Sequence, residues 1–170
     1  MQRFKVPGLF VLAFGLIYAF VFDSKLDMGG DNAGYIILGQ ALLQGEGYTN
    51  IHIPGSPPAS HFPPGYPALL ALAMVFGKGF TWLKVVNGVL FASALWWFRG
   101  FAERASGSAS LAWVAVILVG LNSHLLRSST IIMSEIPYTA ASMLALWTLL
   151  RWNPETKPFY KSYDFWLVVV

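Results

Sequence analysis

The sequence predicts an all-α membrane protein, a polytopic helical bundle with a long loop on the outer face. The chain is 56% hydrophobic and only 11% charged, and its charged residues lie in short polar breaks between long apolar runs, as in multi-pass proteins. Its 16% aromatic content is more than a water-soluble core absorbs. Half of the acids, half of the glycines and two of the three histidines gather in residues 23–65, where we expect the chemistry.

Composition also excludes several classes of site. The chain has no cysteine, which rules out a disulfide framework and a thiolate metal site within it. The formal net charge of +3 is small, and the basic residues lie beside apolar segments, so nucleic acid is not an expected partner. The sequence contains no phosphate-binding Walker loop, no nucleophile elbow and no dinucleotide fingerprint.

Four apolar runs approach the roughly 20 residues needed to cross hydrocarbon. They are residues 6–22, 80–98, 110–126 and 136–152, and a further run opens at Phe165. The first run follows Arg3 and Lys5 as in a signal sequence, but no small-residue cleavage site precedes Asp23, so we expect a retained span. Because the run at Phe165 is unfinished, we interpret residues 1–170 as a fragment of one transmembrane domain, which would be inactive alone.

The distribution of basic residues predicts the orientation. The apolar stretch 67–76 is about ten residues long, which is too short to cross and suits a juxtamembrane helix. The remaining spans then place these basic residues on one side: Arg3, Lys5, Arg99, Arg104, Arg151, Lys157 and Lys161. By the positive-inside rule that side is the cytoplasm. We therefore expect a multi-pass protein of the plasma membrane, the inner membrane in a bacterium, with its N-terminus in the cytoplasm and with the loop 23–79 outside.

The outer loop contains a predicted helix followed by an irregular segment. Asp31 or Asn32 can cap a helix that runs to about Gln44, with Gly45 as its C-terminal stop. This helix is apolar over most of its circumference, so we expect it to lie against the membrane or the bundle. The following residues, 45–65, are too rich in glycine and proline for a regular helix.

Two acids stand at the start of this loop. Asp27 and Asp31 are four residues apart, but Gly29 and Gly30 lie between them, so a shared helical face cannot be assumed. One interpretation of Asp31 is a helix cap. The other is a general base, because a carboxylate at a membrane boundary is partly desolvated and its basicity is raised. Both roles can hold at once.

Glu135 also has two interpretations. It opens the fourth predicted span, where Ser134 can cap the helix, Pro137 fits the first turn and an acid complements the helix dipole. That is a sufficient structural explanation. However, Glu135 is expected to emerge on the same side as Asp31, and two acids from separate loops could share a substrate or a divalent cation.

Cations are expected on that side too. Lys84 lies about one helical turn inside the second span, where snorkelling toward water explains it adequately. Arg127 stands beside Ser128, Ser129 and Thr130 and suits bidentate binding of a phosphate. His61 is a loop histidine whose spacing from the other loop histidine fits no zinc template. We assign no metal ligand.

Three segments resemble a known family when they are taken together. They read GGDNAGYIILGQALLQGEGY, HFPPGYPALLALAMVFGKG and TWLKVVNGVLFASALWWF. Their order resembles the opening of the GT-C superfamily of integral membrane glycosyltransferases, above all the branch with the protein O-mannosyltransferases and the aminoarabinose transferase of lipid A. Those enzymes begin with a span and an outward acidic motif followed by a tyrosine, here Tyr35. A Pro-Pro segment then opens a juxtamembrane helix, and the second span carries a basic residue and an asparagine.

The resemblance implies roles for particular residues. Asp31 falls at the loop acid that acts on the acceptor, whereas Asn32 stands where a second acid is common, a departure that weakens a metal site in this loop. Glu135 falls at the acidic position opening the fourth span, which supports the site or a cation. His61 lies near a basic residue that contacts lipid phosphate, and Lys84 matches the basic position of the second span.

The function that the resemblance implies is inverting transfer of a sugar from a polyprenyl-phosphate donor to a hydroxyl of a protein, lipid or glycan acceptor. Two alternatives remain open. One is a polytopic transporter or flippase, suggested by Lys84 and the acids near membrane ends. Transporters usually have inverted repeats and interrupted helices, and the sequence predicts neither in these spans. The other is a non-catalytic membrane subunit whose long loop binds a partner.

Overall fold

The computed structural model describes residues 5–25, 27 and 30–151 and shows an all-helical chain over them, as predicted. The run that opens at Phe165 lies outside the described residues, as do Arg3, Lys157 and Lys161. Within the described part there are seven helices and no strand. They are α1 (Lys5–Val21), α2 (Asn32–Gln44), α3 (Gly65–Phe76), α4 (Phe80–Ser106), α5 (Ala109–Gly120), α6 (Ser123–Ser129) and α7 (Glu135–Arg151).

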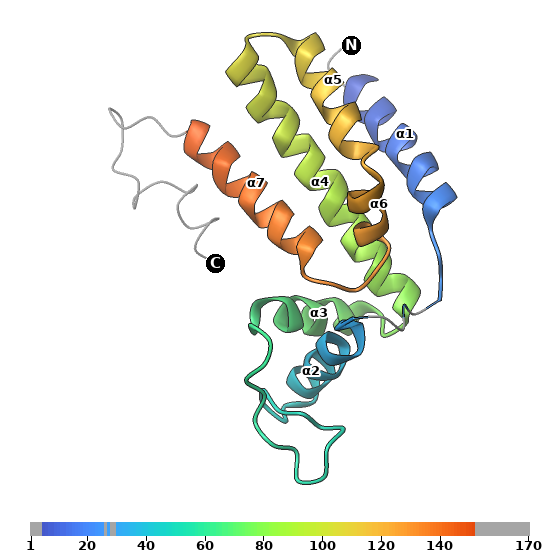
Figure 1. Ribbon diagram of the computed structural model, residues 1–170, viewed down its shortest axis with the longest axis vertical. Helices are drawn as coiled ribbons and strands as arrows, with labels where there is room; N and C mark the ends of the chain where they lie inside the picture. Colours follow the sequence, from blue (N-terminus) through green and yellow to red (C-terminus); the bar gives the residue numbers. More distant parts are fainter. Residues whose placement is uncertain (1–4, 26, 28–29, 152–170) are drawn as a thin grey trace.

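The longest helix, α4, organises the others. Helices α5 and α7 pack on it from two sides, and α1 runs along the outside of the α4–α5 pair (Figure 1). Helices α2 and α3 pack against each other at the end where α4 begins, and the loop between them, residues 45–64, extends away from the bundle (Figure 1). The long loop predicted from the sequence therefore forms a separate layer at one end of the helices.

Three of the four predicted spans correspond to single helices, and one does not. The runs 6–22 and 136–152 match α1 and α7 to within one residue at each end, and the run 80–98 extends into the longer α4. The prediction that no span is interrupted is wrong for 110–126, because α5 and α6 meet there at a bend of 67°, although together they are long and apolar enough for one broken span. The cause is Asn122, whose side chain accepts hydrogen bonds from the N–H groups of His124 and Leu125 and starts a new helix.

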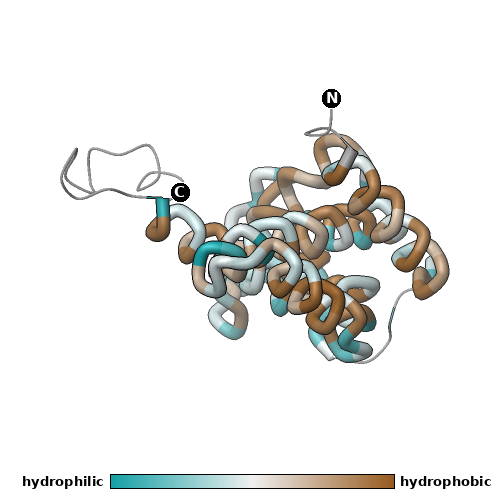
Figure 2. Tube along the Cα trace, turned by 90° about the horizontal axis from the view of Figure 1, so that it is seen from above, coloured by the Kyte–Doolittle hydropathy of each residue, from teal (hydrophilic) through white to brown (hydrophobic). Residues whose placement is uncertain are grey.

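The evidence for membrane association comes from helix length and composition. Helix α4 has 27 residues and is apolar enough to cross a membrane, and α5 with α6 passes the same test as one broken span. Helices α1 and α3 are apolar but shorter. Figure 2 shows hydrophobic residues along most of the helical trace. These findings support membrane association weakly, through one helix or two, and the four-span arrangement stays a prediction.

The buried residues form two clusters. The first joins α2, α3, the start of α4 and the link between α6 and α7. Its members are Tyr35, Ile36, Tyr66, Leu70, Ala73, Met74, Leu83 and Ile132. The second lies along the bundle and comprises Phe91, Leu95, Val116, Leu126 and Ile136. Helix α2 thus packs against the protein, one of the two options that its apolar circumference allowed, and it ends at Gly45, whose left-handed backbone (φ 78°) is the predicted stop.

The end of the bundle away from α2 and α3 carries arginines that lie over tryptophan rings. The guanidinium of Arg99 lies 5.6 Å from the ring centre of Trp96 and 5.1 Å from that of Trp113, and Arg151 lies 4.2 Å from the ring centre of Trp147. Each guanidinium lies within about 6 Å of an aromatic ring, the range in which a cation is attracted to the ring face. The two ends of the molecule therefore differ in charge and in chemistry.

The close approach of α1 to α4 depends on the absence of a side chain at Gly88. A Cβ atom there would lie 2.5 Å from Cζ and 2.9 Å from Oη of Tyr18. The Tyr18 hydroxyl cannot move freely, because it donates to the main-chain oxygens of Lys84 (2.7 Å) and Ser129 (3.0 Å). We expect Gly88→Ala to lower the free energy of unfolding by about 1–3 kcal/mol, measured by thermal unfolding in detergent.

The matched control is Gly15→Ala in α1, where a Cβ atom would meet nothing within 4 Å. It should leave the melting temperature unchanged or raise it slightly, since alanine favours helix. Equal melting temperatures for the two variants would show that the α1–α4 contact is not tight.

Candidate functional site

The first turn of α2 is docked on the link between α6 and α7. The Asn32 side-chain oxygen accepts a hydrogen bond from the main-chain N–H of Ile132 at 2.8 Å, and the Tyr35 hydroxyl shares one with the Ser134 hydroxyl at 3.1 Å. At Gly30 a Cβ atom would lie 3.5 Å from the Met133 sulfur. Two segments about 100 residues apart in the sequence are thereby held together, and they are the segments that carry Asp31 and Glu135.

Asp31 occupies the N-cap position of α2 but does not act as a side-chain cap. Its carboxylate is exposed and makes no capping hydrogen bond, although its main-chain oxygen accepts the first helical bond, from the N–H of Tyr35 at 3.1 Å. The interpretation of this side chain as a helix cap is therefore wrong. Asp27 is half-buried and lies ahead of α2, so the two acids share no helix, as the intervening glycines indicated.

Glu135 is exposed and is the first residue of α7. An acid in this position complements the helix dipole, as predicted. The Ser134 hydroxyl, which the sequence offered as a cap, shares a hydrogen bond with the Tyr35 hydroxyl, and the Ser134 main-chain oxygen accepts from the N–H of Tyr138 at 2.9 Å. The contacts made by residues 132 and 134 on one side and by residues 30, 32 and 35 on the other bring Glu135 and Asp31 to the same end of the bundle.

Two buried tyrosines, Tyr35 and Tyr66, belong to the hydrophobic cluster next to the contact between α2 and the α6–α7 link. Tyr35 is buried, and its ring centre lies 4.6 Å from that of Phe62 and 5.0 Å from that of Tyr66. Burial raises the pKa of the Tyr66 phenol well above its usual range; its hydrogen bond with Asn87 opposes the shift, and the charges of Glu135 and Tyr35 add to it. Tyr66 is therefore a neutral hydrogen-bond donor at physiological pH, within electrostatic reach of Glu135.

Lys84 is buried at 1% exposure, so the snorkelling interpretation is wrong. Its ammonium group donates to the main-chain oxygen of Asp23 at 2.7 Å and to that of Lys25. Carbonyl groups compensate part of the loss of hydration that burial imposes on the ammonium. Lys84 thus fastens the connection between α1 and α2 to the first turns of α4, and its contact with a phosphate stays a prediction.

The other two predicted cations are exposed. Arg127 lies in the last turn of α6, and its side chain is exposed. Its main-chain oxygen accepts a hydrogen bond from the Thr130 hydroxyl at 2.9 Å. His61 packs edge-to-face on Phe62, with ring centres 4.6 Å apart, and Phe62 in turn contacts Tyr35. His61 therefore borders the cluster that supports α2. The guanidinium and imidazole groups are both accessible from solvent.

A metal centre finds little support in the described residues. Among residues 5–25, 27 and 30–151, no three histidine, aspartate or glutamate side chains gather closely enough to hold an ion. A divalent cation bound by Asp31 and Glu135 stays a prediction.

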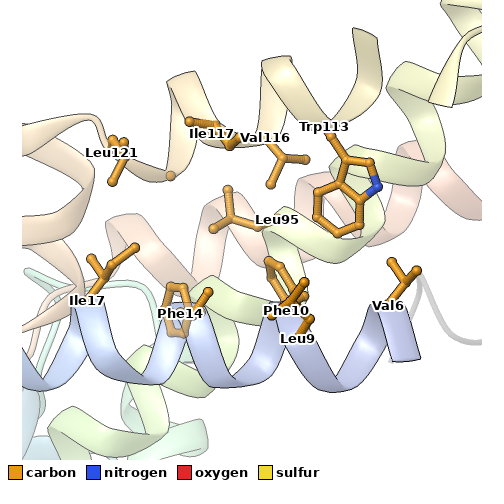
Figure 3. A pocket seen from close by; sticks show the side chains of 12 residues that line it. Val6, Leu9, Phe10, Phe14, Ile17, Leu95, Trp113, Val116, Ile117 and Leu121 are labelled. Carbon is orange, nitrogen blue, oxygen red and sulfur yellow. The ribbon is translucent and has the colours of Figure 1, made fainter. Parts of the chain in front are cut away.

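Two apolar grooves flank α1 away from the acids. One, of about 460 Å³, lies between α1 and α5, and Figure 3 shows its lining as hydrocarbon apart from the indole nitrogen of Trp113. The other, of about 570 Å³, lies between α1 and α4. Neither groove is lined by a charged side chain. The second is lined by two hydroxyl groups, those of Tyr18 and Ser93, and both donate to main-chain oxygens. Neither groove therefore resembles a site for a sugar or a phosphate. The exposed acids Asp31 and Glu135 lie instead where α2 meets the α6–α7 link.

Comparisons with protein-family models, with curated proteins and with solved structures found no match to this chain. The functional interpretation therefore rests on the residues, on their geometry and on the resemblance of the three sequence segments. Sequence reasoning named Asp31, Glu135 and Tyr35 but missed the part that Asn32 and Asn87 play beside them. The available signal for Asn87 was an amide set among apolar residues, where a buried polar group needs a partner. No comparable signal marked Asn32.

The role of Lys84 can be tested by proteolysis. Lys84→Met keeps an unbranched apolar side chain, one atom shorter, but removes both bonds to the α1–α2 connection, so we expect faster cleavage by trypsin after the exposed Lys25. The matched control is Lys78→Met, which removes an exposed lysine from the turn before α4 and should leave the rate at Lys25 unchanged. Unchanged cleavage in the Lys84 variant would show that the connection is held by other contacts.

Proposed function

We propose that this protein is a membrane glycosyltransferase that moves a sugar from a polyprenyl-phosphate donor to an acceptor hydroxyl at the outer face of the membrane. The observation that supports the proposal is that Asp31 and Glu135 are exposed on either side of one contact, the docking of α2 on the α6–α7 link. Arginines Arg99, Arg104 and Arg151 belong to the other end (Figure 1). The resemblance of the three segments to GT-C enzymes supplies the reaction class.

The proposed membrane arrangement follows from this polarity. Helices α1, α4 and α7 and the bent pair α5–α6 each cross, and α2 and α3 stay on the outer side. The arginine-rich end faces the cytoplasm, as the positive-inside rule requires. A site on the outer surface suits a donor whose sugar is carried on a membrane lipid, because the lipid chain stays in the bilayer while the sugar phosphate reaches the acids.

In the proposed reaction, Asp31 accepts the proton of the acceptor hydroxyl as that oxygen attacks the anomeric carbon of the sugar. The bond between the anomeric carbon and the phosphate oxygen breaks, and polyprenyl phosphate leaves with the electron pair from the opposite face. The configuration at the anomeric carbon is therefore inverted. The absence of a capping bond leaves the Asp31 carboxylate available for this proton.

The departing phosphate needs positive charge nearby. Arg127 is exposed and can bind two phosphate oxygens at once, and His61 offers a second donor. Lys84 already donates to two main-chain oxygens, so Arg127 and His61 are the better candidates for the phosphate. Glu135 would orient the acceptor or help to bind a divalent cation.

The proposal predicts that Asp31→Asn abolishes most transfer. We expect kcat to fall by about 100- to 10,000-fold, the usual contribution of a general base, measured as release of polyprenyl phosphate by the full-length protein from a panel of polyprenyl-phosphate sugars. Glu46→Gln is the matched control, since it removes another exposed loop acid at the far end of α2 and should retain activity. Activity near wild type in Asp31→Asn would remove this residue from the mechanism.

The proposed orientation predicts the accessibility of three positions. Cysteine can be introduced singly at Asp31, Glu135 and Arg104 because the chain contains none. In sealed cells a membrane-impermeant maleimide should label the first two variants and should label the third only after permeabilisation. Labelling of Asp31→Cys and Glu135→Cys from opposite sides would exclude a shared site and would favour a transporter or a structural subunit.

A further inference from the structure

One peptide unit in the α6–α7 link is bound on both sides by asparagine side chains. The N–H of Ile132 donates to the side-chain oxygen of Asn32 at 2.8 Å, and the side-chain nitrogen of Asn87 donates to the carbonyl oxygen of Ile131 at 2.6 Å. These two groups belong to the same peptide bond, between residues 131 and 132. In a trans peptide they point in opposite directions, so the two asparagines approach the unit from opposite sides.

The polarity of the peptide fixes the orientation of both amides. The atom of Asn32 that faces an N–H must be its oxygen, and the atom of Asn87 that faces a carbonyl must be its nitrogen. The other end of Asn87 is also used, since its oxygen accepts a hydrogen bond from the Tyr66 hydroxyl at 3.2 Å. A continuous chain of hydrogen bonds thus runs from α3 through α4 and the link peptide to α2.

All of these side chains are buried. Asn87 is 0% exposed, Asn32 1% and Tyr66 6%. A buried polar group that loses its partner keeps the full cost of its desolvation, about 1–3 kcal/mol. The link peptide therefore cannot slide along α2 or α4 without leaving several groups unsatisfied at once. Its position is fixed by hydrogen bonds as well as by packing.

We propose that Asn32 and Asn87 are positioning residues that set the place of Glu135 relative to Asp31. Asn32 is the sequence neighbour of Asp31, and the peptide that it binds lies three residues before Glu135. Asn87 holds the same peptide from α4. The inference rests on the proposed function in treating the two acids as one site, whereas the geometry that it asserts can be measured without any reaction.

The first test measures the distance between the acids' positions directly. In the full-length protein in nanodiscs, with any cysteines outside this chain replaced, spin labels on Asp31→Cys and Glu135→Cys report their separation by pulsed electron resonance. We expect one narrow distance distribution in this parent. Asn32→Leu and Asn87→Leu should replace it with a broad or shifted one. Thr148→Val removes a buried hydroxyl from α7 that bonds only within its helix, to Ala145, and should leave the parent distribution unchanged.

Milder variants test the direction of each bond and guard against loss of folding. Asn32→Asp keeps the acceptor for the N–H of Ile132 and should stay closer to the parent than Asn32→Leu. Asn87→Asp places an oxygen against the carbonyl of Ile131 and should broaden the distribution. Tyr66→Phe removes only the hydroxyl that orients Asn87 and should broaden it less. The inference is overturned if folded Asn87→Asp and Tyr66→Phe proteins both keep the narrow parent distribution.

A second test uses the enzyme with both acids intact. Misplacing one reacting group lowers kcat, by about 10- to 100-fold for a shift of about 1 Å, while binding of the donor is retained. We expect this loss in Asn87→Asp with little change in KM, and a smaller loss in Asn32→Asp. Full activity in Asn87→Asp would contradict positioning. Absence of transfer by the unmodified protein would defeat the proposed function instead, and the distance measurements would still decide the inference.

Discussion

The structure depends on the need to satisfy polar groups that are buried among apolar helices. The link between α6 and α7 brings main-chain N–H and C=O groups beside a hydrophobic cluster, where they are buried or part-buried. Side chains from α2 and α4 supply their hydrogen-bond partners. This requirement fixes the position of α2 on the bundle more sharply than the packing of aliphatic surfaces alone would.

The same rule operates at the start of α4. The Lys84 ammonium and the Tyr18 hydroxyl each donate to main-chain oxygens. Lys84 joins α4 to the segment after α1, and Tyr18 joins α1 to α4 and α6. The acids of the proposed site lie on segments anchored by these bonds. Their own carboxylates remain exposed, so the hydrogen bonds of the framework do not use the two acids of the proposed site.

Local sequence signals predicted the helices well, and long-range contacts account for what they missed. Gly45 marked the end of α2 because a left-handed residue is needed there. The bend after α5 was missed because apolar residues continue across it, although Asn122 was a local signal for a new helix. The partners of Asn32 and Asn87 lie 100 and 44 residues away. Periodicity and capping patterns carry no information about such pairs, so their role required the fold.

The length of α4 has a consequence for the depth of Lys84 in the proposed membrane arrangement. The 27 residues of α4 rise about 40 Å, against a hydrocarbon thickness of about 30 Å. If Arg99 lies at the inner boundary, a stretch of about 20 residues ends near Phe80, and Lys84 would lie roughly one turn below the outer headgroups. The main-chain oxygens of Asp23 and Lys25 would then supply, at that depth, the acceptors that water supplies to an exposed ammonium.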